Sequence, residues 1–196
     1  MAIIVVLQFI VRWRLSKIIQ TSSPEQRTAL ESIASQLETI TQQTFRSPDN
    51  KLELRYPSTW IQIPMSDDAR KVAAGGELLL RAAKFTLQGT SAQLIVTELA
   101  GDKALEEIIE EMKESNKKQG WNIEIVSPDI QETEAVFEMI YTNEETSQTM
   151  RSKEKVLVLE QEPRKIFNIA VLSNKSDWEE FAKEAEDIID SARLIL

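Results

Sequence analysis

The chain has no cysteine among its 196 residues. This absence excludes disulfide bonds, thiolate nucleophiles, cysteine-ligated metals and cysteine-anchored lipids. It does not identify the cellular compartment. The hydrophobic content of 42% and the charged content of 28% are ordinary for a globular protein. The core is therefore large enough to be stable without disulfide bonds.

Histidine is also absent. Without an imidazole the chain alone cannot form a Ser-His-Asp triad, a histidine general base, a histidine-ligated zinc site or a histidine pH switch. Enzymes that use only carboxylates, lysine or tyrosine remain compatible with the sequence. The absence of histidine therefore makes an enzymatic function less expected.

Basic residues are few and unevenly distributed. The chain has 23 basic and 32 acidic residues, a net charge of −9. Residues 1–20 contain Arg12, Arg14 and Lys17 and no acid, so 20 basic and 32 acidic residues remain in 21–196, a net charge of −12. Binding to a nucleic-acid backbone needs clustered basic residues, so we expect no nucleic-acid partner.

The chain begins with an apolar segment that is short for a membrane span. Residues 2–11 are apolar except Gln8, and a basic cluster with Trp13 follows. A transmembrane helix needs about 20 apolar residues. Three interpretations remain: a membrane helix whose upstream part is missing, a short interfacial anchor, or a buried strand. The basic and aromatic flank favours an anchor within 1–20, and Arg12, Arg14 and Lys17 would then mark the cytoplasmic side.

A connecting helix is predicted after this segment. Ser23 is a suitable N-cap, Pro24 fits the first helical position, and apolar residues then recur at spacings of three and four. The pattern predicts a helix over 24–43 within a connecting segment 21–45. It covers too few repeats for a coiled coil, so we expect this helix to lie on the following domain or on a second copy.

Residues 46–196 are expected to form one domain. Apolar residues alternate in 135–141, which is typical of a half-buried strand, whereas 156–159 and 166–172 are almost continuously apolar, which is typical of strands buried on both faces. Between 46 and 50, and over 65–77, the sequence predicts loops. The predicted strands are 51–56, 59–63, 78–87, 92–99, 121–127, 131–143, 148–161 and 164–173. The predicted helices are 103–119, capped by Asp102 and ended by Gly120, and a helix to about Ser191 opened by a capping box at 176–179.

Short links between these strands indicate a mainly antiparallel sheet. The sequence therefore predicts an α+β fold in which helices cover both faces of a central sheet of about six strands, an α/β/α sandwich preceded by an N-terminal helix.

The stretch 52–64, LELRYPSTWIQIP, is the most informative about the fold. Pro57 should break the ladder between two short strands, and Tyr56 and Trp60 should fix that corner to the core. The segment Tyr56-Pro57-Ser58-Thr59-Trp60 resembles the start of domains of the PsbP-like fold family, named for the extrinsic P protein of photosystem II. Residues 155–194 are similar to the last hairpin, final helix and Ser-x-Arg ending of that family, so the resemblance spans about 50–196.

The resemblance implies a non-catalytic binding or assembly module. Family members include photosystem II subunits, photosystem assembly factors and a Ran-binding import factor. The photosystem protein stabilises a manganese-calcium-chloride centre through basic N-terminal residues and a histidine-dependent surface. This chain has no histidine and an acidic body, so we expect neither that metal role nor photosystem docking.

Possible sites have simpler explanations. The acids of the predicted helix 103–119 suit a hard cation, but they also form the solvated face opposite its apolar stripe; these are Glu106, Glu107, Glu110, Glu111 and Glu114. Loop acids at 67–68 and 144–145 are explained by solubility. Gly75-Gly76 lacks the Lys-Ser/Thr of a P-loop, and the Ser-Lys pairs at 16–17 and 152–153 place their side chains apart. Trp60, Trp121 and Trp178 are expected to pack. We therefore predict no catalytic residue, no metal ligand and no cofactor.

Two classes of function follow. The first is a membrane-tethered, non-catalytic domain that acts as an accessory, assembly or scaffolding factor of a protein complex. The alternative is a carboxylate-based hydrolase or divalent-ion enzyme, or a domain that binds a small solute. Clustered carboxylates with shifted pKa values in a pocket would favour the enzyme, and an exposed apolar patch with a polar rim would favour the binding module. The sequence leaves the partner and the oligomeric state open.

Overall fold

The computed structural model describes residues 42–71, 76–86, 90–99, 101, 103–161 and 163–195. The N-terminal segment 1–20 lies outside these residues. So does the helix predicted over 24–43, except for its last two residues. Gln42 and Gln43 lie in strand β1 (Gln42–Arg46), so residues 42–45 join a sheet instead of the connecting helix. No helix of the described residues is long and apolar enough to cross a membrane.

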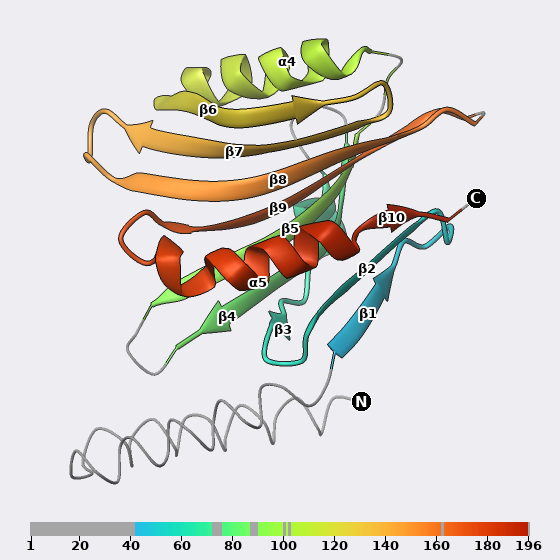
Figure 1. Cartoon of the computed structure of the whole chain (residues 1–196), viewed down its shortest axis with the longest axis horizontal. Coiled ribbons are helices and arrows are strands. Elements are labelled where there is room, and N and C mark those ends of the chain that lie inside the picture. Colours follow the sequence, from blue (N-terminus) through green and yellow to red (C-terminus); the bar gives the residue numbers. More distant parts are fainter. Residues whose placement is uncertain are drawn as a thin grey trace, which may run out of the picture.

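A seven-stranded antiparallel sheet forms the centre of the molecule (Figure 1). Its strand order is β3-β4-β5-β9-β8-β7-β6, and every neighbouring pair is antiparallel. Its strands are β3 (Ile61–Gln62), β4 (Glu77–Phe85), β5 (Ser91–Leu99), β6 (Trp121–Ile130), β7 (Glu134–Asn143), β8 (Thr149–Leu159) and β9 (Lys165–Asn174). The antiparallel sheet agrees with the sequence-based expectation, although β3 is shorter than the predicted strand 59–63.

One helix covers each face of this sheet. Helix α4 (Leu105–Lys118) packs on Val156 and Val158 of β8, whereas α5 (Trp178–Ser191) shares a core with Leu157 of the same strand. Successive residues of a strand point to opposite faces, so an uninterrupted apolar run is needed where both faces are covered. The two-sided burial predicted for 156–159 is therefore confirmed.

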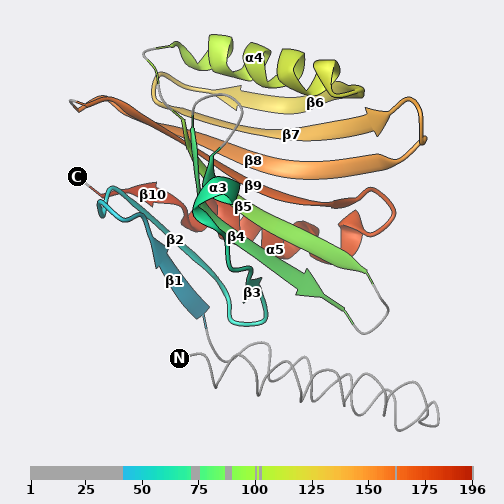
Figure 2. The same cartoon turned by 180° about the vertical axis from the view of Figure 1, so that it is seen from behind.

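A second, smaller sheet was not predicted. It has the order β1-β2-β10, with β2 (Leu52–Pro57) in the centre and β10 (Arg193–Leu194) after the last helix. Leu52 and Leu54 of β2 belong to the same core as α5 and the large sheet. Helix α5 contacts β2 as well as β8 and β9, so it packs between the two sheets (Figures 1 and 2).

The corner at 57–60 carries the chain from the small sheet to the large one. Tyr56 and Trp60 are fully buried in the shared core, as the sequence predicts. The Tyr56 hydroxyl accepts a hydrogen bond from Gln62 Nε2 (2.6 Å), and Trp60 Nε1 donates to Glu184 of α5 (2.9 Å). Pro57 ends β2, and the strands on either side belong to different sheets. The two aromatics therefore hold the sheet-to-sheet corner against α5.

The helix ends differ from the predicted caps. Helix α4 begins after Ala104, whose N–H donates to Glu107 Oε2 (3.3 Å), and the predicted cap Asp102 lies outside the described residues. Gly120, with φ of +81°, follows the helix as predicted, because a left-handed backbone suits glycine. The prediction of a capping box at the start of α5 is wrong. Asp177 is the N-cap, and its side chain makes no capping hydrogen bond. A four-residue helix, α3 (Asp67–Arg70), interrupts the loop predicted over 65–77.

Candidate functional site

A carboxyl group is buried among polar side chains beneath α4. Glu154 of β8 is only 1% exposed and lies on the face that α4 covers. It accepts hydrogen bonds from the Tyr141 hydroxyl, from Ser152 Oγ (2.7 Å) and from Asn168 Nδ2 (3.3 Å). We call these four residues the buried acid cluster. They come from β7, β8 and β9, so strand register alone brings them together.

Burial controls the protonation of this cluster. Desolvation raises the pKa of Glu154, and the hydrogen bonds it accepts offset only part of that effect. Burial and the neighbouring Glu154 carboxyl likewise raise the pKa of Tyr141. Asn168 Oδ1 is buried and has no partner among the described residues. A half-turn of that amide would bring its oxygen to the carboxyl, where a protonated Glu154 can donate to it. The arrangement therefore suits a neutral Glu154 that holds three strands together.

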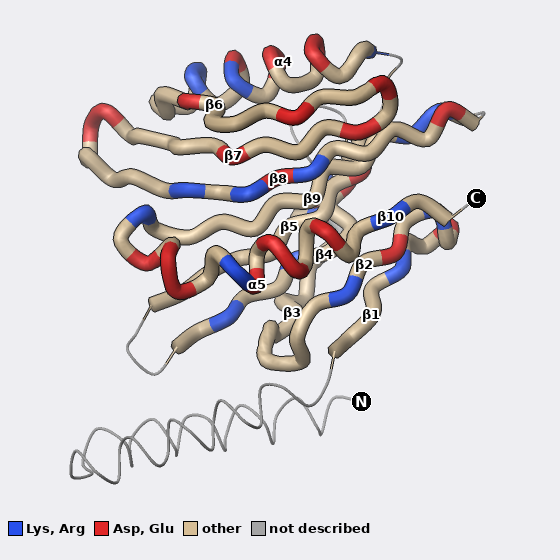
Figure 3. The backbone as a smooth tube through the Cα atoms, viewed as in Figure 1, with Lys and Arg blue, Asp and Glu red and all other residues tan. Residues whose placement is uncertain are grey.

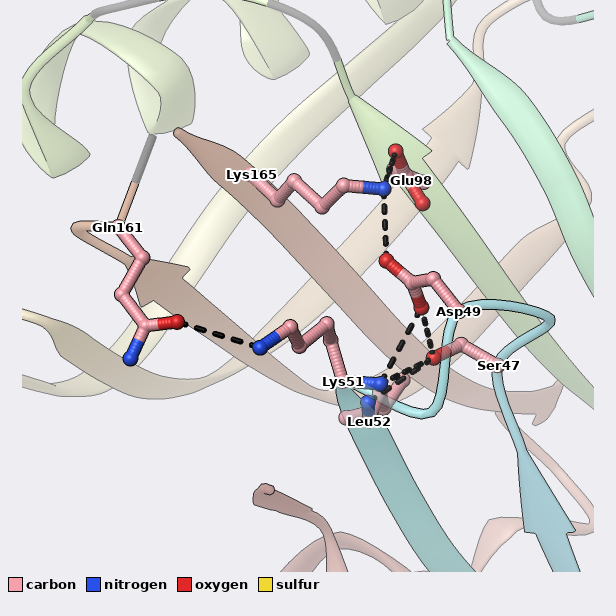
Figure 4. Close-up of polar contacts among 7 residues, drawn as sticks. All are labelled: Ser47, Asp49, Lys51, Leu52, Glu98, Gln161 and Lys165. Carbon is pink, nitrogen blue, oxygen red and sulfur yellow. Dashed lines mark hydrogen bonds and ion pairs between the residues drawn. The ribbon is translucent and has the colours of Figure 1, made fainter. Parts of the chain in front are cut away.

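A second polar group, the junction cluster, joins the two sheets (Figure 4). It consists of Asp49 in the β1–β2 loop, Glu98 at the end of β5 and Lys165 at the start of β9. Lys165 Nζ lies 2.7 Å from Asp49 Oδ2 and 2.8 Å from Glu98 Oε1. Asp49 Oδ1 also accepts hydrogen bonds from Ser47 Oγ (2.5 Å) and from the Lys51 N–H (3.2 Å). These contacts fix the β1–β2 loop of the small sheet to the ends of β5 and β9, two inner strands of the large sheet.

The junction cluster lowers the pKa of its carboxyl group Asp49, whereas the buried acid cluster raises the pKa of Glu154. Burial acts to raise the pKa of Asp49, but the Lys165 ammonium and the hydrogen bonds from Ser47 and Lys51 outweigh it and lower that pKa to about 2. Hydrogen bonds from Lys165 to Asp49 and Glu98 raise the pKa of the Lys165 ammonium. Asp49 and Lys165 are therefore both charged across the neutral range.

A groove of about 450 Å³ lies beside the junction cluster. It runs between β10 and the ends of β7 and β8, and β10 itself approaches β8. The end of β8 at Val158 and Leu159, whose side chains are buried, lines the groove together with the half-buried Leu194. The rim contains three exposed polar residues, Thr133, Glu160 and Gln161. The groove is thus an apolar depression with a polar rim, in which extended chains or small apolar groups can lose water contact.

The structure places most acidic candidates on solvated surfaces. The five glutamates of α4 are exposed, opposite the buried Leu105, Ile108 and Ile109, and Figure 3 shows acidic residues along this helix and along α5. Asp68 and the turn acids Glu144 and Glu145 are also exposed. In the part of the chain that the structure describes, no three acidic side chains converge to hold a metal ion. The α4 glutamates therefore lie on the exposed face opposite the helix's buried stripe.

The remaining candidates are dispersed. Ser152 donates to Glu154 on the α4 side, whereas Lys153 pairs with Glu186 of α5 on the other face (3.2 Å). This pair therefore points apart, as predicted for adjacent strand residues. A side chain at Gly76 would meet the Glu98 carbonyl at 2.5 Å, which explains glycine there by close packing. Ser16-Lys17 and Gly75 lie outside the described residues.

Sequence reasoning did not identify either polar cluster or the groove. Part of the junction cluster had a local signal, because Ser47-Pro48-Asp49-Asn50 is a turn sequence in which an Asp side chain accepts backbone hydrogen bonds. No sequence signal indicated that Asp49 would meet Glu98 and Lys165, since the three residues come from separate parts of the chain. The groove likewise depends on β10, a strand too short to be recognised from its two residues.

No protein-family model matches the sequence, and no curated protein matches it. Solved structures share its fold. Cyanobacterial PsbP (CyanoP) from Synechocystis has a TM-score of 0.53 and 11% identity, covering 79% of this chain and 93% of that chain. The Ran-binding protein Mog1p of Saccharomyces cerevisiae has a TM-score of 0.52 and 12% identity, covering 79% and 95%. LpqN of Mycobacterium tuberculosis, involved in cell envelope biogenesis, has a TM-score of 0.50 and 11% identity, covering 80% and 91%.

The chain therefore has the PsbP-like fold that the Tyr56–Trp60 segment and the last hairpin and helix predict. At 11–12% identity the likeness establishes the fold and nothing about residues or ligands.

Proposed function

We propose that the chain is a non-catalytic, membrane-tethered binding domain that serves as an accessory, assembly or scaffolding factor of a protein complex. The fold neighbours support such a role, since Mog1p is a Ran-binding protein and LpqN is involved in cell envelope biogenesis. The proposed tether is the apolar segment within 1–20. Arg12, Arg14 and Lys17 would keep the domain on the cytoplasmic side.

The groove is the observation that carries this proposal. The half-buried Leu194 lies in it beside the end of β8 and beneath a polar rim, which is the arrangement expected of a binding module. The acids do not form a comparable reaction site. Glu154 is buried and accepts hydrogen bonds from its neighbours, and Asp49 is held by Lys165.

The test is purification of the full chain from its native membranes with quantitative identification of the proteins that accompany it. Thr133→Arg fills the groove from an exposed rim position without touching the core. Thr146→Arg is the matched control, because it makes the same exchange at an exposed turn at the far end of the β7–β8 hairpin. We expect specific partners with the unmodified chain and with Thr146→Arg, and their depletion with Thr133→Arg.

Two results would overturn the proposal. One is that no protein accompanies the full chain above the level of an unrelated membrane protein. The other is turnover of ester or phosphoester substrates that depends on Mg²⁺ or Ca²⁺ and disappears with Glu154→Gln. The second result would favour the carboxylate-based enzyme instead.

A further inference from the structure

The outer edge of β10 presents backbone groups to the groove. The Ile195 N–H donates to the carbonyl of Lys51, the residue that precedes β2 (2.8 Å). Leu194 lies opposite Leu52 in the ladder. Hydrogen-bonded and non-hydrogen-bonded pairs alternate along an antiparallel ladder. The pair next to Ile195 and Lys51, which is Leu194 and Leu52, is therefore a non-hydrogen-bonded pair.

The contacts of Leu52 agree with this assignment. Its N–H donates to Ser47 Oγ (2.9 Å) and its carbonyl accepts from the Ser47 N–H (3.0 Å), so both groups point toward β1 and away from β10. The N–H and carbonyl of Leu194 consequently point away from β2. Among the described strands β10 is the outermost of the small sheet, and Leu194 lines the groove. A hydrogen-bond donor and an acceptor therefore face the groove from its edge.

The groove also has a cation beside it. Lys51 extends toward the β8–β9 hairpin, where its Nζ lies 3.2 Å from Oε1 of the rim residue Gln161 (Figure 4). Lys165 in the same region is held by two carboxylates, whereas Lys51 has a neutral amide as its side-chain partner within the described residues. An ammonium with only an amide partner can accept a carboxylate at little cost in existing contacts.

We propose that the groove binds an extended polypeptide segment of a partner protein, which adds as a strand beside Leu194 and places a carboxylate on Lys51. A peptide main chain supplies both the acceptor and the donor that the Leu194 edge requires, and its side chains would pack on the half-buried Leu194. A free small solute could fill the groove but would leave the backbone pair unmatched. The inference rests on the proposed binding function and specifies the class of partner and the residues that select it.

A random linear dodecapeptide library displayed on phage, panned against the full chain in detergent micelles, provides the probe. We expect the selected peptides to be rich in β-branched residues and to share an acidic side chain or a free carboxyl end. Bound peptide should slow hydrogen exchange of the Leu194 amide at least tenfold. The Arg193 and Ile195 amides already bond within the sheet, so their exchange should change little.

Two variant pairs separate the backbone and charge contributions. Leu194→Pro removes the outward N–H and should weaken peptide binding about tenfold, whereas Leu194→Val keeps that N–H and should stay within about twofold of the unmodified chain. Lys51→Met should lower the affinity for acidic peptides about fivefold at low salt, and Lys51→Arg should retain it. The exchange measurement uses the unmodified chain, so it remains decisive if Leu194→Pro fails to fold.

Selection of no peptide, or peptide binding that leaves the Leu194 amide unprotected, would overturn strand addition at this edge. Equal binding by Lys51→Met and the unmodified chain would overturn the assignment of Lys51. These outcomes leave the proposed function intact if membrane partners are still recovered and lost with Thr133→Arg. Failure of the proposed function would instead be seen in that purification, which uses no peptide.

Discussion

The buried acid cluster and the junction cluster place the same chemical group in two different surroundings. Glu154 lies beneath α4 with hydroxyl and amide donors and no cation, and burial raises its pKa. Asp49 lies at the meeting point of the sheets beside the Lys165 ammonium, and its pKa falls to about 2. The neutral donors around Glu154 offset only part of the cost of its burial, whereas at Asp49 the Lys165 ammonium and the hydrogen bonds from Ser47 and Lys51 outweigh that cost. One carboxyl therefore lies in the core with a raised pKa, and the other joins the two sheets as an ion.

The strongest test of this contrast is deletion of the buried carboxyl. Glu154→Ala should lower the free energy of unfolding by about 3 kcal/mol, because it opens a cavity and leaves the donors of Tyr141, Ser152 and Asn168 without an acceptor. Glu154→Gln keeps the shape and is neutral, so it should cost less than about 1 kcal/mol. Urea unfolding of the full chain measures both. A large loss with Glu154→Gln would mean that the folded state needs the charge.

Removal of the junction cation should have a smaller effect. Lys165→Met leaves Asp49 and Glu98 facing each other without a counter-ion and should cost about 1 kcal/mol of unfolding free energy. Lys153→Met is the matched control, since its partner Glu186 is well exposed, and it should cost about 0.3 kcal/mol. Equal costs in the same urea titration would show that Lys165 is an ordinary surface lysine.

The two clusters should respond to pH in opposite directions. The pKa of Asp49 falls from its usual 3.8 to about 2, so its contribution is present above 3.8 and is lost as the pH falls toward 2. The pKa of Glu154 is raised above its usual 4.5, so its contribution is full below 4.5 and declines as the pH rises through the folded-state pKa.

In Lys165→Met, the free energy of unfolding should therefore fall less steeply as the pH drops from 3.8 toward 2. In Glu154→Gln, the free energy of unfolding should depend less on pH above 4.5. Thermal unfolding in a series of buffers at constant ionic strength provides the measurement. If Glu154→Gln leaves the alkaline slope unchanged, Glu154 does not titrate with folding.

Salt should produce the smallest difference. Raising the ionic strength to about 0.5 M should reduce the cost of Lys165→Met by a few tenths of a kcal/mol, because the junction ions are partly open to solvent. The cost of Glu154→Ala should not change, since that cluster holds no ion pair. A parallel loss of both costs in the same salt series would indicate that Glu154 is charged after all.

Much of the fold follows from local patterns in the sequence. The continuous apolar run at 156–159 requires cover on both faces, and the structure provides α4 on one side and α5 on the other. Tyr56 and Trp60 are buried at the predicted corner. The solvated acids of α4 follow from the helical spacing of its buried residues. In each case, neighbours along the chain contain the whole signal.

The small sheet and both clusters depend on distant partners and could not be predicted in this way. Gln42 and Gln43 fall within the helix predicted over 24–43, and pairing with β2 places them in a strand instead. Glu154 has no apolar neighbour pattern that marks it as buried, because its donors arrive from β7 and β9 through register. The side chains of Asp49, Glu98 and Lys165 meet only after both sheets have assembled.

The pairing of β2 with β10 has a consequence for the order in which the molecule forms. The ion pair between Glu53 and Arg193 joins residues 140 positions apart, and β10 follows directly after α5. Contacts of such long sequence separation close late and slow the folding of a domain. During synthesis, the edge of β2 that pairs with β10 stays unpaired until Arg193 has left the ribosome and α5 has packed. An unpaired strand edge is a site at which an incompletely folded chain can pair with other chains, so late pairing of β10 with β2 leaves such a site open longest.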